Sequence, residues 1–353
     1  MSARAALEAW AHRQWASRGL IPCLLTPLAF VYLCIVESRR RSARPTALPV
    51  PVAVVGNIYV GGTGKTPVTI ALVRELAARG WHPGIVSRGF GRRGEGVKLV
   101  EEDSLAADVG DEPLLIRRQT GVPVAVGAER EKAGELLLRT YPDIDLIVSD
   151  DGLQHLGLAR DLELAVVGAG GLGNGWVLPA GPLREPPSRL DAVDAIVLNT
   201  ADEAVVKSRT PRFATSSCFG VCRHLADGAQ STIDALSERI AREGLRPLAA
   251  AGIASPGRFF AMVRAHGIDC AELELGDHYG YERNPFAGRG EDIIFITGKD
   301  AVKCAQHEAI ASDPRIWVVD LEIKLDAYLV DFADERLRAA AEARKAGAAK
   351  PAA

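Results

Sequence analysis

The sequence lacks the features that would mark a nucleic-acid-binding or a disulfide-bonded protein. Its formal net charge is only −3 over 353 residues, so no general electrostatic attraction to nucleic acid is expected. None of the six cysteines forms a CxxC pair, and the Cys218/Cys222 spacing has no second metal-ligand pair nearby. We therefore expect reduced, structural thiols in a cytosolic compartment.

The sequence also lacks internal repeats and any unusual bias in composition. Hydrophobic residues make up 48% and charged residues 25%, as in an ordinary globular protein. Because single cores stop growing near about 250–300 residues, the length favours two domains. We predict a membrane-associated segment at 1–44, a nucleotide-binding domain at 45–213, a second α/β domain at 214–330 and a solvated tail at 331–353. Within this plan the polar region 202–217 is predicted to be a linker, and the tail from Arg336 a fraying helix.

One long stretch without charge stands out near the N-terminus. Residues 19–36 (GLIPCLLTPLAFVYLCIV) contain no charged side chain. As a helix they would span about 27 Å against a hydrocarbon core of about 30 Å, and Pro22 and Pro27 would interrupt it. No A-x-A-like cleavage site follows, which argues against a signal peptide. Arginines flank the stretch on both sides, at positions 13, 18, 39, 40, 41 and 44. This pattern favours a segment lying in a membrane interface or a short anchor over a buried core helix.

The rest of the chain alternates short apolar runs with helical spacing. Val52–Val55 predicts a buried strand, and Thr66–Arg79 carries apolar residues at the spacing of a helix. The alternation predicts a mostly parallel sheet with helices on both faces, followed by a second, smaller α/β domain with a helix at 257–265. Further strands are predicted at 84–87, 122–126, 145–149, 164–167, 195–198, 247–251, 271–275, 293–297 and 316–320.

A glycine-rich loop connects the first predicted strand to the first helix. It matches the Walker A pattern G-x-x-x-x-G-K-[ST] except at its first position. Small residues allow consecutive backbone N–H groups to face phosphates, the lysine supplies charge to the β- and γ-phosphates, and the last hydroxyl can bind Mg²⁺. We predict that the loop binds a nucleotide and that this nucleotide is ATP. The residues expected to bind it are Tyr59, Val60, Gly61, Gly62, Thr63, Gly64, Lys65 and Thr66.

The strand predicted at 145–149 runs directly into two acids, Asp150 and Asp151. This is a Walker B arrangement, in which burial of the strand positions a carboxylate beside the metal ion that the phosphates share. The sequence does not distinguish which of the two binds Mg²⁺. Most of the other polar groups follow predicted strands, where ligands of open α/β sheets gather, while Asp111 and Glu112 lie in a glycine-flanked turn and Arg184 and Glu185 lie between prolines. These groups are Arg88, the pair Asp111 and Glu112, Arg130, His155, Arg184 with Glu185, and His278 in the second domain.

Taken in order, these motifs resemble those of the lipid A biosynthetic kinase family, the tetraacyldisaccharide 4′-kinases. The resemblance covers roughly residues 10–325. It rests on VGNIYVGGTGKTP (55–67), SRGFGRR (87–93), VGDEP (109–113), DDGLQH (150–155), GPLREP (181–186), AGIASPGRFF (251–260), DHYGY (277–281) and TGKDAVKC (297–304). It implies transfer of the ATP γ-phosphate to the 4′-hydroxyl of a tetraacyldisaccharide 1-phosphate, forming lipid IVA. It also implies two α/β/α domains and work at the cytoplasmic face of the bacterial inner membrane.

The resemblance further implies roles for individual residues. Asp111 would accept the hydroxyl proton with help from His278, and the acyl chains of the substrate would explain the apolar N-terminus. Substrate binding would fall to Asn57, Arg88, Glu112, Arg130, His155 and Arg184, and Mg²⁺ binding to Thr66, Asp150, Asp151 and Glu185. One position departs from the family pattern: Gly298 stands where the family usually has glutamate. The roles of its neighbours Lys299 and Asp300 are therefore left open.

Two other interpretations fit parts of the sequence. In a P-loop GTPase or metallochaperone, Asn199–Asp202 would take the place of the guanine-reading N-K-x-D motif, but Thr200 replaces the lysine. A non-enzymatic, membrane-associated nucleotide-binding module would contain the same loop and need no proton acceptor. Turnover of ATP against GTP separates the first from the kinase, and substitution of Asp111 separates the second.

Overall fold

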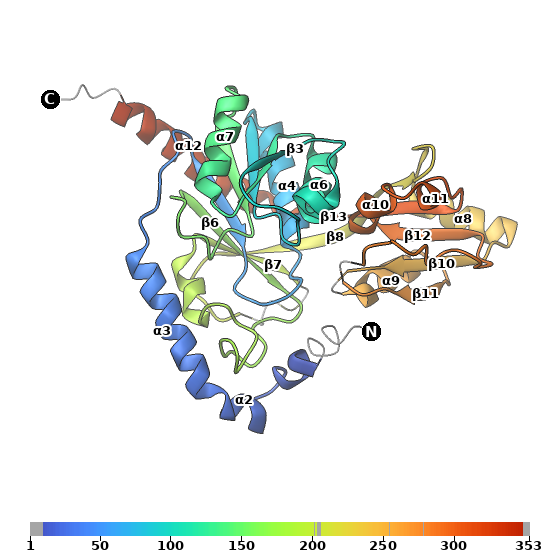
Figure 1. The fold of residues 1–353 in the computed structure, drawn as a ribbon, viewed down its shortest axis with the longest axis horizontal. Coiled ribbons are helices and arrows are strands. Elements are labelled where there is room, and N and C mark those ends of the chain that lie inside the picture. The colour runs from blue at the N-terminus through green and yellow to red at the C-terminus, as the bar shows by residue number, and fades with distance from the viewer. Residues whose placement is uncertain (1–9, 201, 203–205, 254, 278, 349–353) are drawn as a thin grey trace.

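The structure, a computed structural model, describes residues 10–200, 202, 206–253, 255–277 and 279–348 (Figure 1). Its strands form one continuous sheet in the order β11-β10-β12-β13-β8-β7-β6-β1-β5-β2-β4-β3, with β9 paired to β8. The half from β7 to β3 belongs to the first domain and the half from β11 to β13 to the second. The mostly parallel α/β architecture with a second, smaller α/β unit confirms the predicted fold class.

The first domain is built on strands that the apolar runs predicted. All its neighbouring pairs are parallel except β3, which runs antiparallel to β4. Its strands are β1 (Val52–Gly56), β2 (Pro83–Ser87), β3 (Lys98–Val100), β4 (Val124–Val126), β5 (Leu146–Asp150), β6 (Leu162–Gly168) and β7 (Ala195–Asn199). Strand β1 lies between β5 and β6, and Val55 pairs with Asp150. The glycine loop after β1 therefore emerges beside the two acids after β5.

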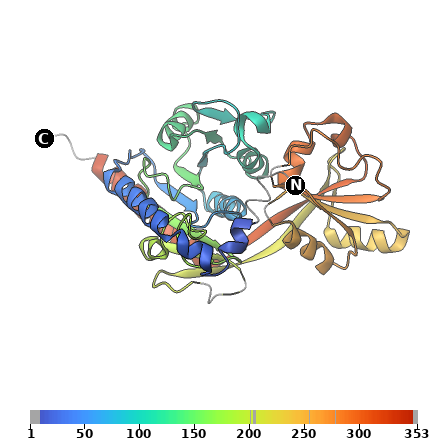
Figure 2. The ribbon, with the colours of Figure 1, turned by 60° about the horizontal axis from the view of Figure 1, so that its bottom comes forward.

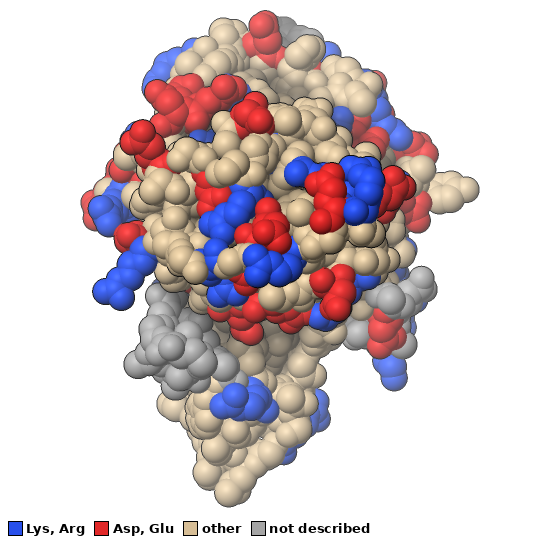
Figure 3. Space-filling model, turned by 90° about the vertical axis from the view of Figure 1, so that its right-hand side faces the viewer, with Lys and Arg blue, Asp and Glu red and all other residues tan. Residues whose placement is uncertain are grey.

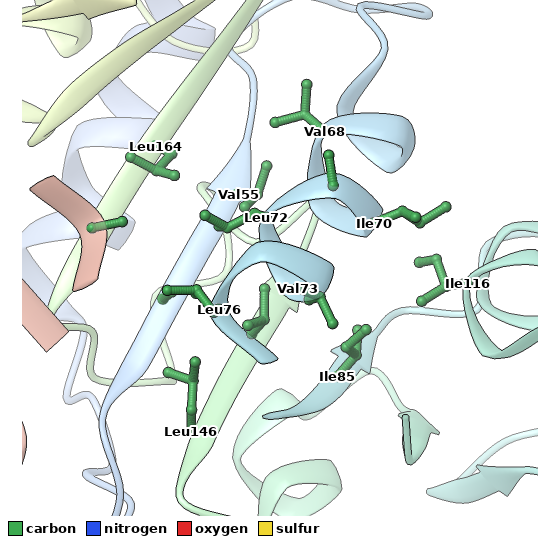
Figure 4. Close-up of a cluster of buried hydrophobic side chains, with 14 of the residues drawn as sticks. Val55, Val68, Ile70, Leu72, Val73, Leu76, Ile85, Ile116, Leu146 and Leu164 are labelled. Atoms are coloured by element: carbon green, nitrogen blue, oxygen red, sulfur yellow. The ribbon is translucent and has the colours of Figure 1, made fainter. Parts of the chain in front are cut away.

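Helices cover both faces of this sheet, which is why its strands are apolar throughout rather than alternating. Ala53 and Val55 face a core formed with α4 (Lys65–Ala78), while Val52 and Val54 face the opposite core, formed with α7 (Arg130–Thr140). Figure 4 shows Leu72 and Leu76 of α4 packed over β1, β5 and β6. Burying each such leucine stabilises the fold by about 1.5–3 kcal/mol. Shorter helices α5 (Ala106–Val109) and α6 (Asp111–Thr120) and the 3₁₀ helix η1 (Pro187–Ala192) complete this domain.

The second domain repeats the α/β plan on a smaller scale. Strands β10 (Pro247–Ala251), β11 (Ala271–Glu274), β12 (Ile293–Thr297) and β13 (Ile316–Leu325) are parallel to one another. Its helices are α8 (Ile233–Glu243), α9 (Pro256–Ala265), α10 (Gly298–Cys304) and α11 (Glu308–Ala311). Separate apolar cores lie on the two faces of these strands. The strands and the helix predicted for this region are therefore present.

A long strand connects the two domains where the sequence predicts a linker. Strand β8 (Arg212–His224) pairs with β7 over its first residues, then runs antiparallel to β13 and pairs with the short β9 (Gln230–Ser231). The linker prediction for 202–217 is thus wrong from Arg212 onward. The strand escapes detection because small polar side chains, such as Thr215 and Ser217, fill half-buried positions where an apolar residue would be expected. The predicted boundary between 213 and 214 falls inside β8.

The C-terminal helix also differs from its prediction. Helix α12 (Ala327–Ala348) lies against the first domain, and Leu329, Ala333 and Leu337 are buried in the core that contains α4. The indole nitrogen of Trp81 donates to Asp334 at 2.7 Å. The prediction of a solvated tail is therefore wrong for the described part of α12, because one stripe at helical spacing is apolar.

The N-terminal arm, residues 10–42, runs along the lower edge of the first domain in Figure 1, with α3 on the side away from the second domain (Figures 1 and 2). It contains α2 (Leu20–Leu24) and α3 (Thr26–Ser42), which are separated at Leu25. Pro27 lies in the first turn of α3, in agreement with the predicted interruption, whereas Pro22 lies within α2 and does not interrupt it. Its large apolar side chains are exposed at positions 20, 21, 24, 28, 30, 31 and 35. In Figure 3 the arm forms a mostly uncharged projection at the bottom. Among the helices of the described ranges, none is long and apolar enough to cross a membrane.

Candidate active site

The phosphate loop lies at the carboxyl edge of the sheet between β1 and α4. Gly64 adopts a left-handed conformation (φ 81°), which glycine allows without a Cβ clash, and α4 begins at Lys65. Within the loop, the side chain of Asn57 donates to the Thr63 hydroxyl at 2.9 Å, and both residues are buried. The loop thus presents the N-terminus of a 14-residue helix at the edge where Asp150 and Asp151 end β5.

Lys65 and Asp151 connect the loop to the end of β5. The Lys65 ammonium lies 3.6 Å from Asp151 Oδ1, and Arg184 lies 3.3 Å from Oδ2. Burial acts to raise the pKa of Asp151, but the charges of Lys65 and Arg184 outweigh it and the pKa lies below its ordinary value. Asp151 therefore stays ionised and holds both cations at the mouth of the loop.

Asp150 has a different environment although it is the adjacent residue. Its carboxylate is buried and accepts a hydrogen bond from the Thr69 hydroxyl of α4 at 2.9 Å. Burial, together with the charges of Glu112 and Asp151, raises the pKa of Asp150 to about 7. The two predicted metal ligands thus differ in kind: Asp151 is already paired with cations, whereas Asp150 is a buried carboxyl whose charge the surroundings penalise.

The other predicted metal ligands lie in two different environments. Thr66 is half-buried in the first turn of α4. Glu185 is buried, and its carboxylate accepts from Gln154 at 2.7 Å and lies 3.4 Å from the Arg189 guanidinium. Within the described ranges, no three His, Cys, Asp or Glu side chains are grouped to hold a metal ion by themselves. A metal ion here would need the Thr66 hydroxyl and nucleotide phosphates as additional ligands, as Mg²⁺ commonly does.

Asp111 and Glu112 begin α6 and face lysines of the second domain. Lys303 lies 3.7 Å from Asp111 Oδ2, and both side chains are buried. Lys299 lies 3.3 Å from Glu112 and 3.5 Å from Asp277. Burial acts to lower the pKa of Lys299, but the surrounding carboxylates raise it overall. The predicted proton acceptor thus lies at the junction of the two domains. His278, its predicted assistant, lies outside the described residues.

Among the predicted substrate-binding residues, Arg130 and His155 are bound mainly by the protein. Arg130 is buried and donates to the carbonyls of Asp150 and Asp151, each at 3.4 Å. Burial lowers the pKa of Arg130 to about 10, against the opposing charges of the two aspartates. His155 lies 2.9 Å from Glu131 and accepts from the Arg130 backbone N–H. These contacts hold the end of β5 in place, whereas Arg88 is exposed nearby.

Tyr59, the departure from the Walker A pattern, connects the loop to neighbouring segments. It forms a bridge with Leu183, and the adjacent Val60 N–H donates to the Pro182 carbonyl at 2.8 Å. The Tyr59 ring also stacks on His12 of the N-terminal arm, with centroids 6.1 Å apart. The backbone at this position therefore joins the phosphate loop to the segment that carries Arg184 and Glu185, and the Tyr59 ring joins the loop to the N-terminal arm.

The other departure, Gly298, also has a structural reason. Gly298 is the first residue of α10, and a Cβ there would collide with the Asp320 carboxylate of β13. Burial raises the pKa of Asp320. The adjacent Asp300 is structural, since it accepts from the Thr297 hydroxyl at 2.7 Å and from the Gly252 N–H. The glycine is thus matched to Asp320, and no larger residue fits without movement of that carboxylate.

Sequence reasoning missed Lys303, Thr69 and Gln154, which contact the predicted site residues. Lys299 and Lys303 are four residues apart, so they lie on one face of α10, and this spacing after a strand was the available signal. Gln154 donates to both the Asn57 carbonyl and Glu185, and thereby joins two predicted segments. Nothing in their local sequence indicates the contacts of Thr69 and Gln154, which arise from strand order.

A strand, a glycine-rich loop and a helix beside paired acids at the carboxyl edge of a parallel sheet define a P-loop nucleotide-binding protein. Comparison with known proteins narrows the class. A family model described as tetraacyldisaccharide-1-P 4′-kinase matches residues 21–338. The chain therefore belongs to the tetraacyldisaccharide-1-P 4′-kinase family.

Individual relatives with this name are similar to the protein over nearly the whole chain. The protein named tetraacyldisaccharide 4′-kinase from Janthinobacterium sp. (strain Marseille) is 45% identical, with 95% of this chain and 97% of the relative covered. That of Bordetella parapertussis is 45% identical, over 96% and 99%. The crystal structure of LpxK from Aquifex aeolicus in complex with ATP has 27% sequence identity and a TM-score of 0.75, and covers 90% of this chain and 100% of that one. The predicted family is thereby confirmed.

Proposed function

We propose that this protein is an ATP-dependent tetraacyldisaccharide 4′-kinase, which transfers the γ-phosphate of ATP to the 4′-hydroxyl of tetraacyldisaccharide 1-phosphate and forms lipid IVA. The observation that carries the proposal is the contact between Lys65 and Asp151, 3.6 Å apart. This contact places the Lys65 ammonium of the phosphate loop beside Asp151, which directly follows strand β5. Family membership indicates which molecule accepts the phosphate, since the relatives are named tetraacyldisaccharide 4′-kinases.

The residues at this edge suit a magnesium nucleotide. The candidate ligands are Thr66, Asp150, Asp151 and Glu185. Asp150 fits best, because a buried carboxyl whose pKa is raised gains from a neighbouring cation. Glu185 already lies against Arg189, so its charge is partly neutralised by the protein. A bound Mg²⁺ would offset charge on the phosphoryl oxygens. Lys65 would bind the β- and γ-phosphates, and Arg184, held beside Asp151, would face the transferred group.

Asp111 is the proposed proton acceptor. In the reaction the 4′-hydroxyl oxygen forms a bond to the γ-phosphorus, the bond to the ADP oxygen breaks, and the hydroxyl proton passes to the Asp111 carboxylate. The Lys303 ammonium lies 3.7 Å from that carboxylate, so a residue of the second domain is in contact with the proposed acceptor. The role assigned to His278 rests on the sequence resemblance.

We further propose that the protein works at the cytoplasmic face of the inner membrane, bound through the N-terminal arm. Exposed Leu28, Phe30 and Val31 on α3 are followed by a cluster of arginines at 39–41, which suits an interface with anionic lipid. A groove of about 730 Å³ lies beside α3, and its lining is mixed: Leu33, Cys34, Val36 and Pro186 are apolar, and Glu37, Ser38, Arg41 and Ser42 are polar. Pro186 follows Arg184 and Glu185 directly, so a lipid held there would lie close to the proposed site.

The test is transfer of ³²P from ATP to purified tetraacyldisaccharide 1-phosphate in detergent micelles with Mg²⁺. The Asp111→Asn variant should lose roughly a hundredfold to ten-thousandfold in turnover, the range expected for loss of a general base. Asp108→Asn is the matched control, because Asp108 lies nearby on α5 and its carboxylate pairs with the exposed Lys98. Absence of transfer by the folded wild-type protein would refute the kinase proposal.

A further inference from the structure

A series of hydrogen bonds connects the phosphate loop to the second domain. Its centre is Asn199, the last residue of β7, which is buried. The Asn199 side-chain amide nitrogen donates to the Thr63 carbonyl at 3.0 Å. Its amide oxygen accepts from the guanidinium of Arg258 at 3.1 Å. Arg258 belongs to α9, so a residue of the second domain reaches the loop through one intervening side chain.

Arg258 is held at this junction by more than one partner. Its guanidinium also donates to the Ser217 hydroxyl of β8 at 2.5 Å. Burial lowers the pKa of Arg258, so its positive charge is partly desolvated and its hydrogen bonds matter more than those of an exposed arginine. The side chain therefore joins three elements, β7, β8 and α9, at the point where the two domains meet.

The chemistry of arginine determines how the Asn199 amide is oriented. A guanidinium has only donors, so the amide oxygen must face Arg258. The NH₂ group is then directed toward the Thr63 carbonyl. The reverse orientation would set donor against donor on one side and acceptor against acceptor on the other.

The Thr63 carbonyl belongs to the part of the loop that precedes α4. Its hydroxyl is held by Asn57, and the next residue, Gly64, adopts φ 81°. A Cβ at Gly64 would collide with the Asn199 amide, which shows how closely the two pack. Fixing this carbonyl fixes the rotation of the peptide plane that leads into Gly64 and Lys65. Those backbone N–H groups are the ones expected to face phosphate.

We propose that Arg258 is a positioning residue that holds the phosphate loop in its ATP-binding conformation through the Asn199 side chain. Contact between the domains and affinity for ATP are thereby coupled. The inference rests on the proposed binding of ATP at this loop. It gives Asn199 a role other than reading a guanine base, because both polar atoms of its side chain are engaged by the protein.

The test measures the dissociation constant of Mg-ATP by calorimetry on full-length protein carrying Arg258→Ala, Asn199→Ala or both. Each single variant should bind ATP about tenfold more weakly, the size expected for loss of one hydrogen bond that involves a charged group. The double variant should be no weaker than either single variant, because both changes interrupt the same series. Arg258→Lys should recover part of the affinity. Arg264→Ala is the matched control, since Arg264 lies on the same helix and pairs with exposed Glu272.

Asn199→Asp separates this role from a structural one. Aspartate keeps the acceptor for Arg258 but sets a second oxygen against the Thr63 carbonyl, so ATP binding should weaken at least as much as with Asn199→Ala, although the contact between the domains through Arg258 is kept. Wild-type affinity in Asn199→Asp or Arg258→Ala, or additive losses in the double variant, would overturn the inference. A wild-type protein that binds no ATP would instead refute the proposed function.

Discussion

Helices α3 and α12 both lie against the first domain, but they use their apolar residues in opposite ways. Leu28 and Phe30 of α3 are 58% and 67% exposed, although Ala29 between them is buried. Leu329 and Leu337 of α12 are fully buried, in a helix otherwise rich in charged residues and alanine. The content of apolar residues therefore does not tell whether a helix is covered by its own protein. In α12 a narrow stripe meets the core, whereas the wider apolar surface of α3 is left for another partner.

The same substitution in the two helices should have very different effects on stability. Leu337→Ala should lower the free energy of unfolding by about 2–5 kcal/mol, because it leaves a cavity in the core beneath α12. Leu28→Ala should change it by less than about 0.5 kcal/mol, since the side chain is already largely in solvent. Urea unfolding followed by circular dichroism measures both. Equal losses in the two variants would contradict the contrast.

The exposed apolar surface should matter for membrane binding instead. Replacing Leu28 and Phe30 together by glutamine should weaken partitioning to vesicles of anionic phospholipid by about 2 kcal/mol, roughly thirtyfold, because two apolar side chains no longer enter the interface. Sedimentation with vesicles gives the partition constant. The control is Tyr328→Gln, since Tyr328 is 77% exposed on α12. If the control weakens binding equally, or the α3 variant binds normally, α3 is not the membrane-binding surface.

A smaller effect is expected from the ion pair that attaches the end of α12. Arg344 donates to both oxygens of Asp161, at 2.9 and 2.8 Å, and the two side chains are 25% and 19% exposed. Arg344→Met should lower the free energy of unfolding by about 1 kcal/mol, because the pair is bidentate but partly solvated. The loss should shrink in 1 M salt. Arg41→Met on α3, whose pair with Glu37 is exposed, serves as the control and should have no measurable effect.

These helices also show how far sequence reasoning reaches. Runs such as 52–55 and 145–149 predicted central strands because both faces of a parallel sheet are apolar, and the glycine loop and Asp150 followed from their position after those strands. Strand β8 was missed because its small polar residues alternate without a strong apolar face. Contacts such as Asn199 with Arg258 or Asp111 with Lys303 join residues far apart in the sequence. Only the order of strands in the sheet brings them together, so no local pattern predicts them.

The smallest predicted effect concerns a contact that α3 makes and α12 does not. The Tyr32 hydroxyl of α3 donates to the Arg184 carbonyl at 2.9 Å, and the Arg184 side chain lies beside Asp151. Tyr32→Phe should therefore reduce kcat/KM for the lipid acceptor about two- to fivefold, as expected when one neutral hydrogen bond of about 0.5–1 kcal/mol is lost. Stability should stay within about 0.5 kcal/mol of wild type, because the ring remains packed. Tyr328→Phe on α12 is the matched control and should leave kcat/KM unchanged. Wild-type kinetics in Tyr32→Phe would mean that this contact of α3 does not influence the site.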